Sequence, residues 1–123
     1  MWERRAHVKE VKDGDTLRVI IDQGFGDTKT LDLRLYDTWA PEKSEPGGSE
    51  TRGFVAEWLN QNDPDGVDWP YVVTFKRVRA DTHEVVTLGR YVGQLTNPQG
   101  DSLNAAVNAF VASHGYSQGI GRR

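Results

Sequence analysis

Two short segments with apolar residues at every second position constrain the fold more than any other feature. They carry the series Leu17, Val19, Ile21 and the series Leu31, Leu33, Leu35. Because side chains alternate between the two faces of a strand, each segment predicts a β-strand with one buried face. The run Gln23–Asp27 between them is rich in glycine, which accepts the backbone angles that turns require, so it predicts a turn.

Three further strands and a helix are predicted along the chain. A strand from His7 reaches a turn at Asp13–Asp15, and later strands cover Tyr71–Val78 and Leu88–Leu95. Apolar residues at 3.6-residue spacing predict a helix over Glu50–Asn62.

A second helix is predicted near the end of the chain. Asp101 or Ser102 suits its N-cap, and Gly115 suits the position after its last turn. Its apolar stripe is Leu103, Ala106, Val107, Phe110 and Val111. Five strands, with one helix between the third and fourth and one at the C-terminus, predict a mainly β fold with helices (α+β). We expect the five-stranded Greek-key barrel known as the OB-fold.

Length and composition indicate one domain. A chain of 123 residues is long enough for a single hydrophobic core. We assign residues 6–117 to this domain, with tails at residues 1–5 and 118–123. The chain contains no cysteine, which excludes disulfides and thiolate metal ligands.

The N-terminus and the net charge set expectations for location and partners. We find no apolar leader and no membrane-length apolar run, so we expect a cytoplasmic protein without a membrane partner, in the host cytoplasm if a virus encodes it. A monomer is favoured, but the sequence leaves the oligomeric state open. The formal net charge of −3 argues against a tight sequence-reading nucleic-acid binder, which normally has a basic surface. An enzyme with a bound cation tolerates this balance, because the cation is the largest local charge.

Four short motifs occur in a fixed order along the chain. They are Val11–Thr16 (VKDGDT), Arg34-Leu35 with Pro41-Glu42, Gly89-Arg90, and Val107-Asn108 with Gly115-Tyr116. Each motif is common alone. In this order, with Glu42 eight residues after Arg34, they resemble the staphylococcal nuclease (thermonuclease) family over about residues 6–117.

The resemblance implies a metal-dependent nuclease that hydrolyses DNA or RNA with little sequence preference. It makes Asp15 the direct metal ligand and Asp13 a supporting carboxylate. The implied metal is Ca²⁺, or another divalent cation such as Mn²⁺ or Mg²⁺. Hard cations of this kind prefer carboxylate and carbonyl oxygens. The plainer alternative is an Asp-Gly turn with solvated carboxylates.

The resemblance also assigns roles toward the substrate. Arg34 and Arg90 would clamp the phosphate bidentately, Glu42 would act as general base toward water, and Thr16 would support the ligand shell. Simpler roles stay open for the same residues. Arg34 would be a barrel-surface arginine paired with Asp32, Arg90 a solvated strand residue, and Glu42 a loop carboxylate.

Trp39 departs from the family pattern. The family places a second aspartate ligand two residues before the Pro-Glu pair, and this chain has Trp39 at that position. An indole cannot coordinate a cation. Three interpretations follow. In the first, a weaker metal site is formed by Asp15, the backbone carbonyl of Ala40 and waters. In the second, a bulge turns Asp37 into the site as a substitute ligand. In the third, metal binding is lost and Trp39 offers a stacking surface, with simple packing of Trp39 on the barrel as the plain alternative.

Two functions therefore compete. The leading hypothesis is the metal-dependent phosphodiesterase, an endonuclease acting on DNA or RNA. The alternative is a non-catalytic OB-fold module that binds nucleic acid or a protein partner.

Overall fold

The computed structural model describes residues 2–42, 44–61, 69–75 and 90–116, with the backbone alone for Trp2 and Arg90. Residues 76–78 and 88–89 of the predicted strands Tyr71–Val78 and Leu88–Leu95 lie outside these residues. The elements, in chain order, are β1 Trp2–Asp13, β2 Thr16–Gly24, β3 Asp27–Leu35, α1 Gly48–Gln61, β4 Tyr71–Phe75, β5 Arg90–Thr96 and α2 Leu103–His114.

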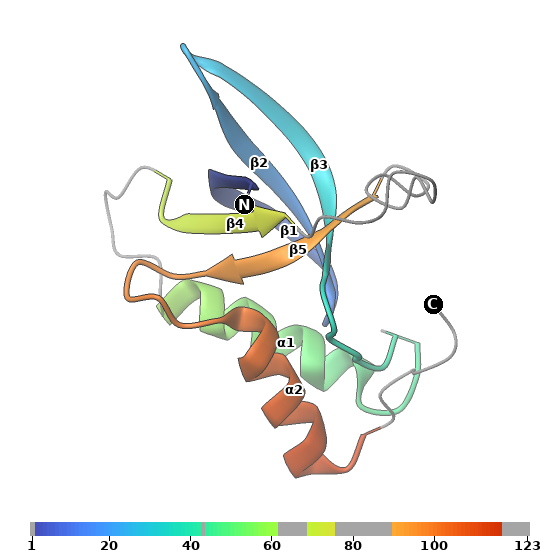
Figure 1. The fold of residues 1–123 in the computed structure, drawn as a ribbon. Coiled ribbons are helices and arrows are strands. Elements are labelled where there is room, and N and C mark those ends of the chain that lie inside the picture. Colours follow the sequence, from blue (N-terminus) through green and yellow to red (C-terminus); the bar gives the residue numbers. More distant parts are fainter. Residues whose placement is uncertain (1, 43, 62–68, 76–89, 117–123) are drawn as a thin grey trace, which may run out of the picture.

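The five strands close into a barrel in the order β1-β2-β3-β5-β4, and β4 pairs back onto β1. All neighbouring strands are antiparallel except β3 and β5, which are parallel. Figure 1 shows both helices on one side of the barrel, while the tip of the β2–β3 hairpin points away from them. The prediction of a mainly β fold with five strands and two helices is confirmed at this level.

The alternating segments form the hairpin that the sequence predicts. Leu17 pairs with Leu33 and Val19 pairs with Leu31, so the two apolar series face the same interior. The members of both series are buried, with exposed fractions from 0% to 6%. Burying them removes most of the apolar surface of both strands from water, at roughly 25 cal/mol per Å².

The first strand begins earlier than the tail boundary at residue 5 suggests. Residues Trp2–Arg5 belong to β1 and pair with Val72–Phe75 of β4. Chain ends fray unless their backbone groups are paired. Here the ladder to β4 supplies the partners, so the assignment of residues 1–5 as a tail is wrong for residues 2–5.

The helices lie at the end of the barrel where β1 ends and β4 begins. Helix α1 buries Thr51, Val55 and Leu59, and the carbonyl of Leu59 accepts a hydrogen bond of 2.6 Å from the Tyr71 hydroxyl. Helix α2 is capped as predicted, because the Ser102 hydroxyl accepts from the amide of Ala105. Gly115 follows α2 in the left-handed conformation, with φ of 67°.

Gly14 is required for packing rather than for an unusual backbone angle. Gly14 is not among the glycines with a positive φ. A Cβ at this position would lie 2.5 Å from Cγ2 of Thr51 and 2.9 Å from Cβ of Ala40. The β1–β2 turn therefore fits directly against α1 and the segment after β3, and only glycine leaves enough room.

Within the described ranges, no helix is long and apolar enough to cross a membrane.

Replacing Gly14 by alanine is expected to destabilise the protein by about 1–3 kcal/mol, the usual cost of overpacking a filled interior. Thr51→Ser removes the closest methyl group but keeps the hydroxyl that donates to Gly47. Added to Gly14→Ala, it is expected to restore part of the loss in urea unfolding. Gly53→Ala is the matched control, because Gly53 lies in α1 with nothing near its absent Cβ. That control should raise stability by about 0.5–1 kcal/mol, and equal effects of the two alanines would contradict the packing argument.

Candidate functional site

The candidate site lies where the β1–β2 turn meets the chain that leaves β3. The amide of Leu35 donates a 2.8 Å hydrogen bond to the backbone carbonyl of Asp15. The segment after Leu35 then runs past Asp15 toward α1. Two of the four sequence motifs, Val11–Thr16 and Arg34–Glu42, therefore lie side by side in the fold.

Asp15 is a buried carboxylate held by two hydrogen bonds. Its exposed fraction is 0%. Oδ1 accepts from the Thr16 hydroxyl at 3.2 Å, and Oδ2 accepts from the backbone amide of Ala40 at 3.2 Å. A buried ionised carboxylate is tolerated only where such donors replace water. The contact between Asp15 and Ala40 runs through the amide of Ala40. It does not involve the carbonyl that one of the three interpretations makes a metal ligand.

Arg34 and Trp39 form a stacked pair beside this carboxylate. The Arg34 guanidinium carbon lies 4.7 Å from the centre of the Trp39 ring, a cation–π contact. Nη1 of Arg34 also donates to the carbonyl oxygens of Leu35 at 3.0 Å and Thr38 at 3.5 Å. The loop thus holds its own arginine at the end of β3, and the half-buried indole covers one face of it.

Two asparagines of α2 hold the loop in place. Asn108 donates to the carbonyl of Asp37 at 2.9 Å and accepts from the amide of Trp39 at 3.3 Å. Asn104, which is buried, donates to the carbonyls of Tyr36 and Gly93 and accepts from the amide of Leu95. Asn108 belongs to the fourth motif, but the sequence does not indicate that its side chain binds this loop. The sequence gives no indication of a role for Asn104.

The remaining predicted residues lie around this centre. Asp13 ends β1, is half-buried and pairs in register with Thr16. Glu42 is exposed, and its amide donates to the Glu45 carboxylate at 2.7 Å. Asp37 is exposed and adopts a left-handed conformation with φ of 52°.

Arg90 begins β5, and its backbone is in register with Asp32 of β3. Asp32 and Arg34 both lie on the polar face of β3, and β5 begins next to Asp32. The direction of the Arg90 side chain lies outside what the structure describes. The structure therefore gathers Asp15, Arg34, Trp39 and Ala40 and places Glu42 two residues further along.

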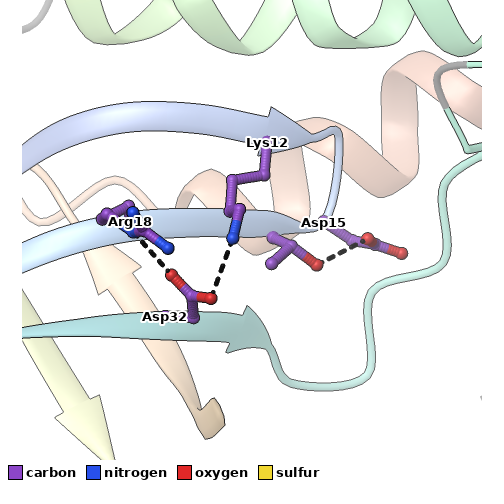
Figure 2. Close-up of polar contacts among 5 residues, drawn as sticks. Lys12, Asp15, Arg18 and Asp32 are labelled. Carbon is purple, nitrogen blue, oxygen red and sulfur yellow. Dashed lines mark hydrogen bonds and ion pairs between the residues drawn. The ribbon is translucent and has the colours of Figure 1, made fainter. Parts of the chain in front are cut away.

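Asp32 joins two cations on the outer face of the barrel. It lies 3.0 Å from Nζ of Lys12 and 3.0 Å from Nε of Arg18 (Figure 2). The alternative that pairs Asp32 with Arg34 is therefore wrong. Arg18 and Asp32 are cross-strand partners, equally distant along the chain from Phe25 in the turn. That equal spacing is the signal from which the pair could have been found.

The ion pairs shift the protonation of both partners. The hydrogen bond from Arg18 is the main cause that holds the pKa of Asp32 below its ordinary value. Partial burial opposes this shift, and Lys12 adds to it. The pKa of Arg18 is raised, first by the same hydrogen bond and then by the charge of Asp32. Both groups therefore stay charged across the physiological range.

The described side chains do not by themselves fit a resident calcium ion. Calcium takes six to eight oxygen ligands, and Asp15 offers one carboxylate whose oxygens already accept hydrogen bonds. Among the residues whose placement is described, no group of three or more His, Asp or Glu side chains is arranged to hold a metal. No catalytic step through a metal follows from this arrangement.

Comparison with known proteins adds no relative. The sequence matches no protein-family model, and a search of curated proteins finds no match.

The Asp32 ion pairs generate a pH prediction. Because the pKa of Asp32 is lowered in the folded protein, its stabilising contribution is present at neutral pH and is lost as pH falls through that lowered value. Asp32→Asn should therefore unfold at a lower urea concentration than the parent at pH 7, and the gap should narrow below about pH 4. A gap that stays constant between pH 7 and pH 3 would contradict this account.

Proposed function

We propose that this protein is an OB-fold module of the staphylococcal-nuclease type that binds single-stranded nucleic acid across the outer face of β2 and β3. The observation that carries the proposal is one polar face that combines the cations Lys12, Arg18 and Arg34 with the indole of Trp39. Proteins that bind single-stranded nucleic acid without sequence preference combine positive charge with aromatic side chains in this way.

The barrel supports the OB assignment. Its strand order, with β3 beside β5 and a helix between β3 and β4, agrees with a Greek-key barrel of this type. OB-folds bind oligonucleotides on the face of their second and third strands. On β2 and β3 of this chain, that face carries Arg18, Asp32 and Arg34, because the alternate positions point into the core.

The charges on this face favour phosphate. Lys12 and Arg18 flank Asp32, and Glu10 adds a second carboxylate because it pairs in register with Arg18. With Arg34, these five side chains carry a net charge of +1. The shared carboxylate also fixes the two cationic groups in space, which lowers the entropy lost when they bind a phosphate. The net charge of −3 belongs to the whole chain and does not describe this face.

The Arg34–Trp39 stack supports binding of unpaired bases. A guanidinium stacked on an indole presents a flat, partly exposed surface with a charge beside it. Bases stack on such surfaces, and the neighbouring phosphate is attracted by the cation. Duplex bases are not available for this contact, so single strands are the expected ligand.

Fluorescence anisotropy with labelled dT and rU oligonucleotides tests the proposal, with a duplex of equal length alongside. We expect single strands to bind with or without chelator, and affinity to fall as salt rises. Trp39→Leu should weaken binding by about 1–3 kcal/mol, the worth of one stacked base. Arg18→Gln should reduce the slope of log affinity against log salt by about 0.7.

Arg52→Gln is the matched control for this titration. Arg52 is an exposed arginine of α1, outside β2 and β3, and donates to the carbonyl of Val11. It should leave both the affinity and the salt slope unchanged. If Arg18→Gln and Arg52→Gln have the same effect, or if duplex binds as tightly as single strands, the proposed face is not the binding surface.

A second candidate function is phosphodiester hydrolysis, and one contact favours it. The hydrogen bond from Ala40 to Asp15 brings the Pro41-Glu42 pair next to the buried carboxylate. In this reading Arg34 binds the phosphate, and the exposed Glu42 takes a proton from water. Trp39 stands at the place where the resembled family has its second aspartate.

Trp39→Asp tests this second candidate. If the loop keeps the family's geometry, the added carboxylate should allow Ca²⁺ binding that calorimetry detects, accompanied by cleavage of labelled DNA. Trp39→Asn is the control, since it has the same size without the charge. Calcium binding by both variants, or by neither, would refute the assignment of this position as a lost metal ligand.

A further inference from the structure

The barrel has a cavity at the end that faces away from the helices. It measures about 230 Å³. The strand positions around it are the start of β1, the end of β2, the start of β3, the end of β4 and the start of β5. The described lining residues are Arg4, Ile21, Gln23, Lys29, Leu31, Phe75 and Tyr91. Asp15 and Trp39 lie at the opposite end, so this cavity is separate from the candidate site.

All seven lining residues occupy inward-facing positions. Each lies an even number of residues from a buried core residue on the same strand, as Lys29 does from Leu33. Deeper in the barrel these positions are apolar. At the mouth they change to arginine, glutamine, lysine and tyrosine. Arg4, Gln23 and Lys29 are exposed, so the inward face of the strands changes from an apolar core to a polar rim at the mouth.

The cavity has an apolar floor. Ile21, Leu31 and Phe75 are 5–6% exposed and form its base. The rings of Phe75 and Tyr91 meet edge to face, with centres 5.8 Å apart. An apolar floor with an aromatic wall suits a flat ring, because ring stacking and edge contacts add to the burial of apolar surface.

The rim of the cavity is cationic. Nζ of Lys29 donates to the Tyr91 hydroxyl at 2.8 Å and lies 5.1 Å from the centre of that ring. Arg4 stands on the β1 side of the same mouth. None of the seven described lining residues is acidic. The rim therefore favours an anionic group and disfavours a cation.

We propose that this mouth binds a small aromatic anion, that is, a single planar ring system bearing a phosphate or carboxylate. The ring would enter against Phe75 and Tyr91, and the anionic group would meet Lys29 and Arg4. Mouths of β-barrels are common places for such ligands. A mononucleotide and a free aromatic carboxylate both have this chemistry. The inference does not depend on the proposed function, since it uses none of the same residues.

Amide chemical-shift titration of the ¹⁵N-labelled protein tests the proposal. The ligands are uridine 5′-monophosphate, benzoate, uridine, benzamide and inorganic phosphate. We expect uridine 5′-monophosphate or benzoate to saturate the site and to shift the amide resonances of Leu31, Phe75 and Tyr91. Saturation by the nucleotide alone identifies the source as a nucleotide, and saturation by benzoate alone identifies an aromatic acid. The neutral rings and phosphate should bind at least about tenfold more weakly, because each lacks one half of the ligand.

Lys29→Gln should lower the affinity for the saturating ligand by about tenfold, because it removes the charged donor at the rim. Arg5→Gln is the matched control, because Arg5 is exposed on the same strand as Arg4 but pairs with Asp22 outside the cavity. It should leave binding unchanged. Three results would overturn the proposal: no saturation by either anion, equal binding of phosphate alone, or shifts confined to the Asp15 end of the barrel.

Discussion

The tie between the Asp15 carboxylate and the Ala40 amide is the contact on which the candidate site depends. It joins the β1–β2 turn to the chain that leaves β3, at a point with no access to water. The packing of Gly14 against Ala40 and Thr51 closes the same junction to α1. Together with the hydrogen bonds from Asn104 and Asn108, the tie fixes the loop that carries Trp39 and Glu42 relative to the barrel.

The Arg34–Trp39 pair shows how one substitution changes the chemistry of a place. A carboxylate at position 39 would add negative charge beside Asp15 and favour a bound cation. An indole instead covers the guanidinium of Arg34 and adds an apolar plane. This arrangement supports the proposed binding of single-stranded nucleic acid more than the proposed hydrolysis. Asn104 and Asn108 reinforce this outcome, because they fix the loop through its backbone whatever its side chains are.

The sequence predicts the barrel well and the site only in part. Strands and caps follow from short-range rules, so the Leu17 and Leu31 series, Ser102 and Gly115 are found where the pattern places them. Long-range contacts obey no such periodicity. The pairing of residues 2–5 with β4, the fit of Gly14 under Thr51 and the reach of Asn104 to Gly93 depend on elements far apart in the chain. Motif spacing brings Asp15 and Arg34 together correctly, but it cannot say which of their atoms are already engaged.

The parallel pairing of β3 with β5 has a consequence for how the chain folds. These neighbours are separated in sequence by α1 and β4, so the barrel cannot close until nearly the whole chain is available. Until then β3 and β4 each present an open row of amide and carbonyl groups, the kind of edge on which other chains assemble. Any fragment that ends before Arg90, where β5 begins, keeps both edges open. The last third of the sequence thus protects the first two thirds from self-association, independently of any ligand.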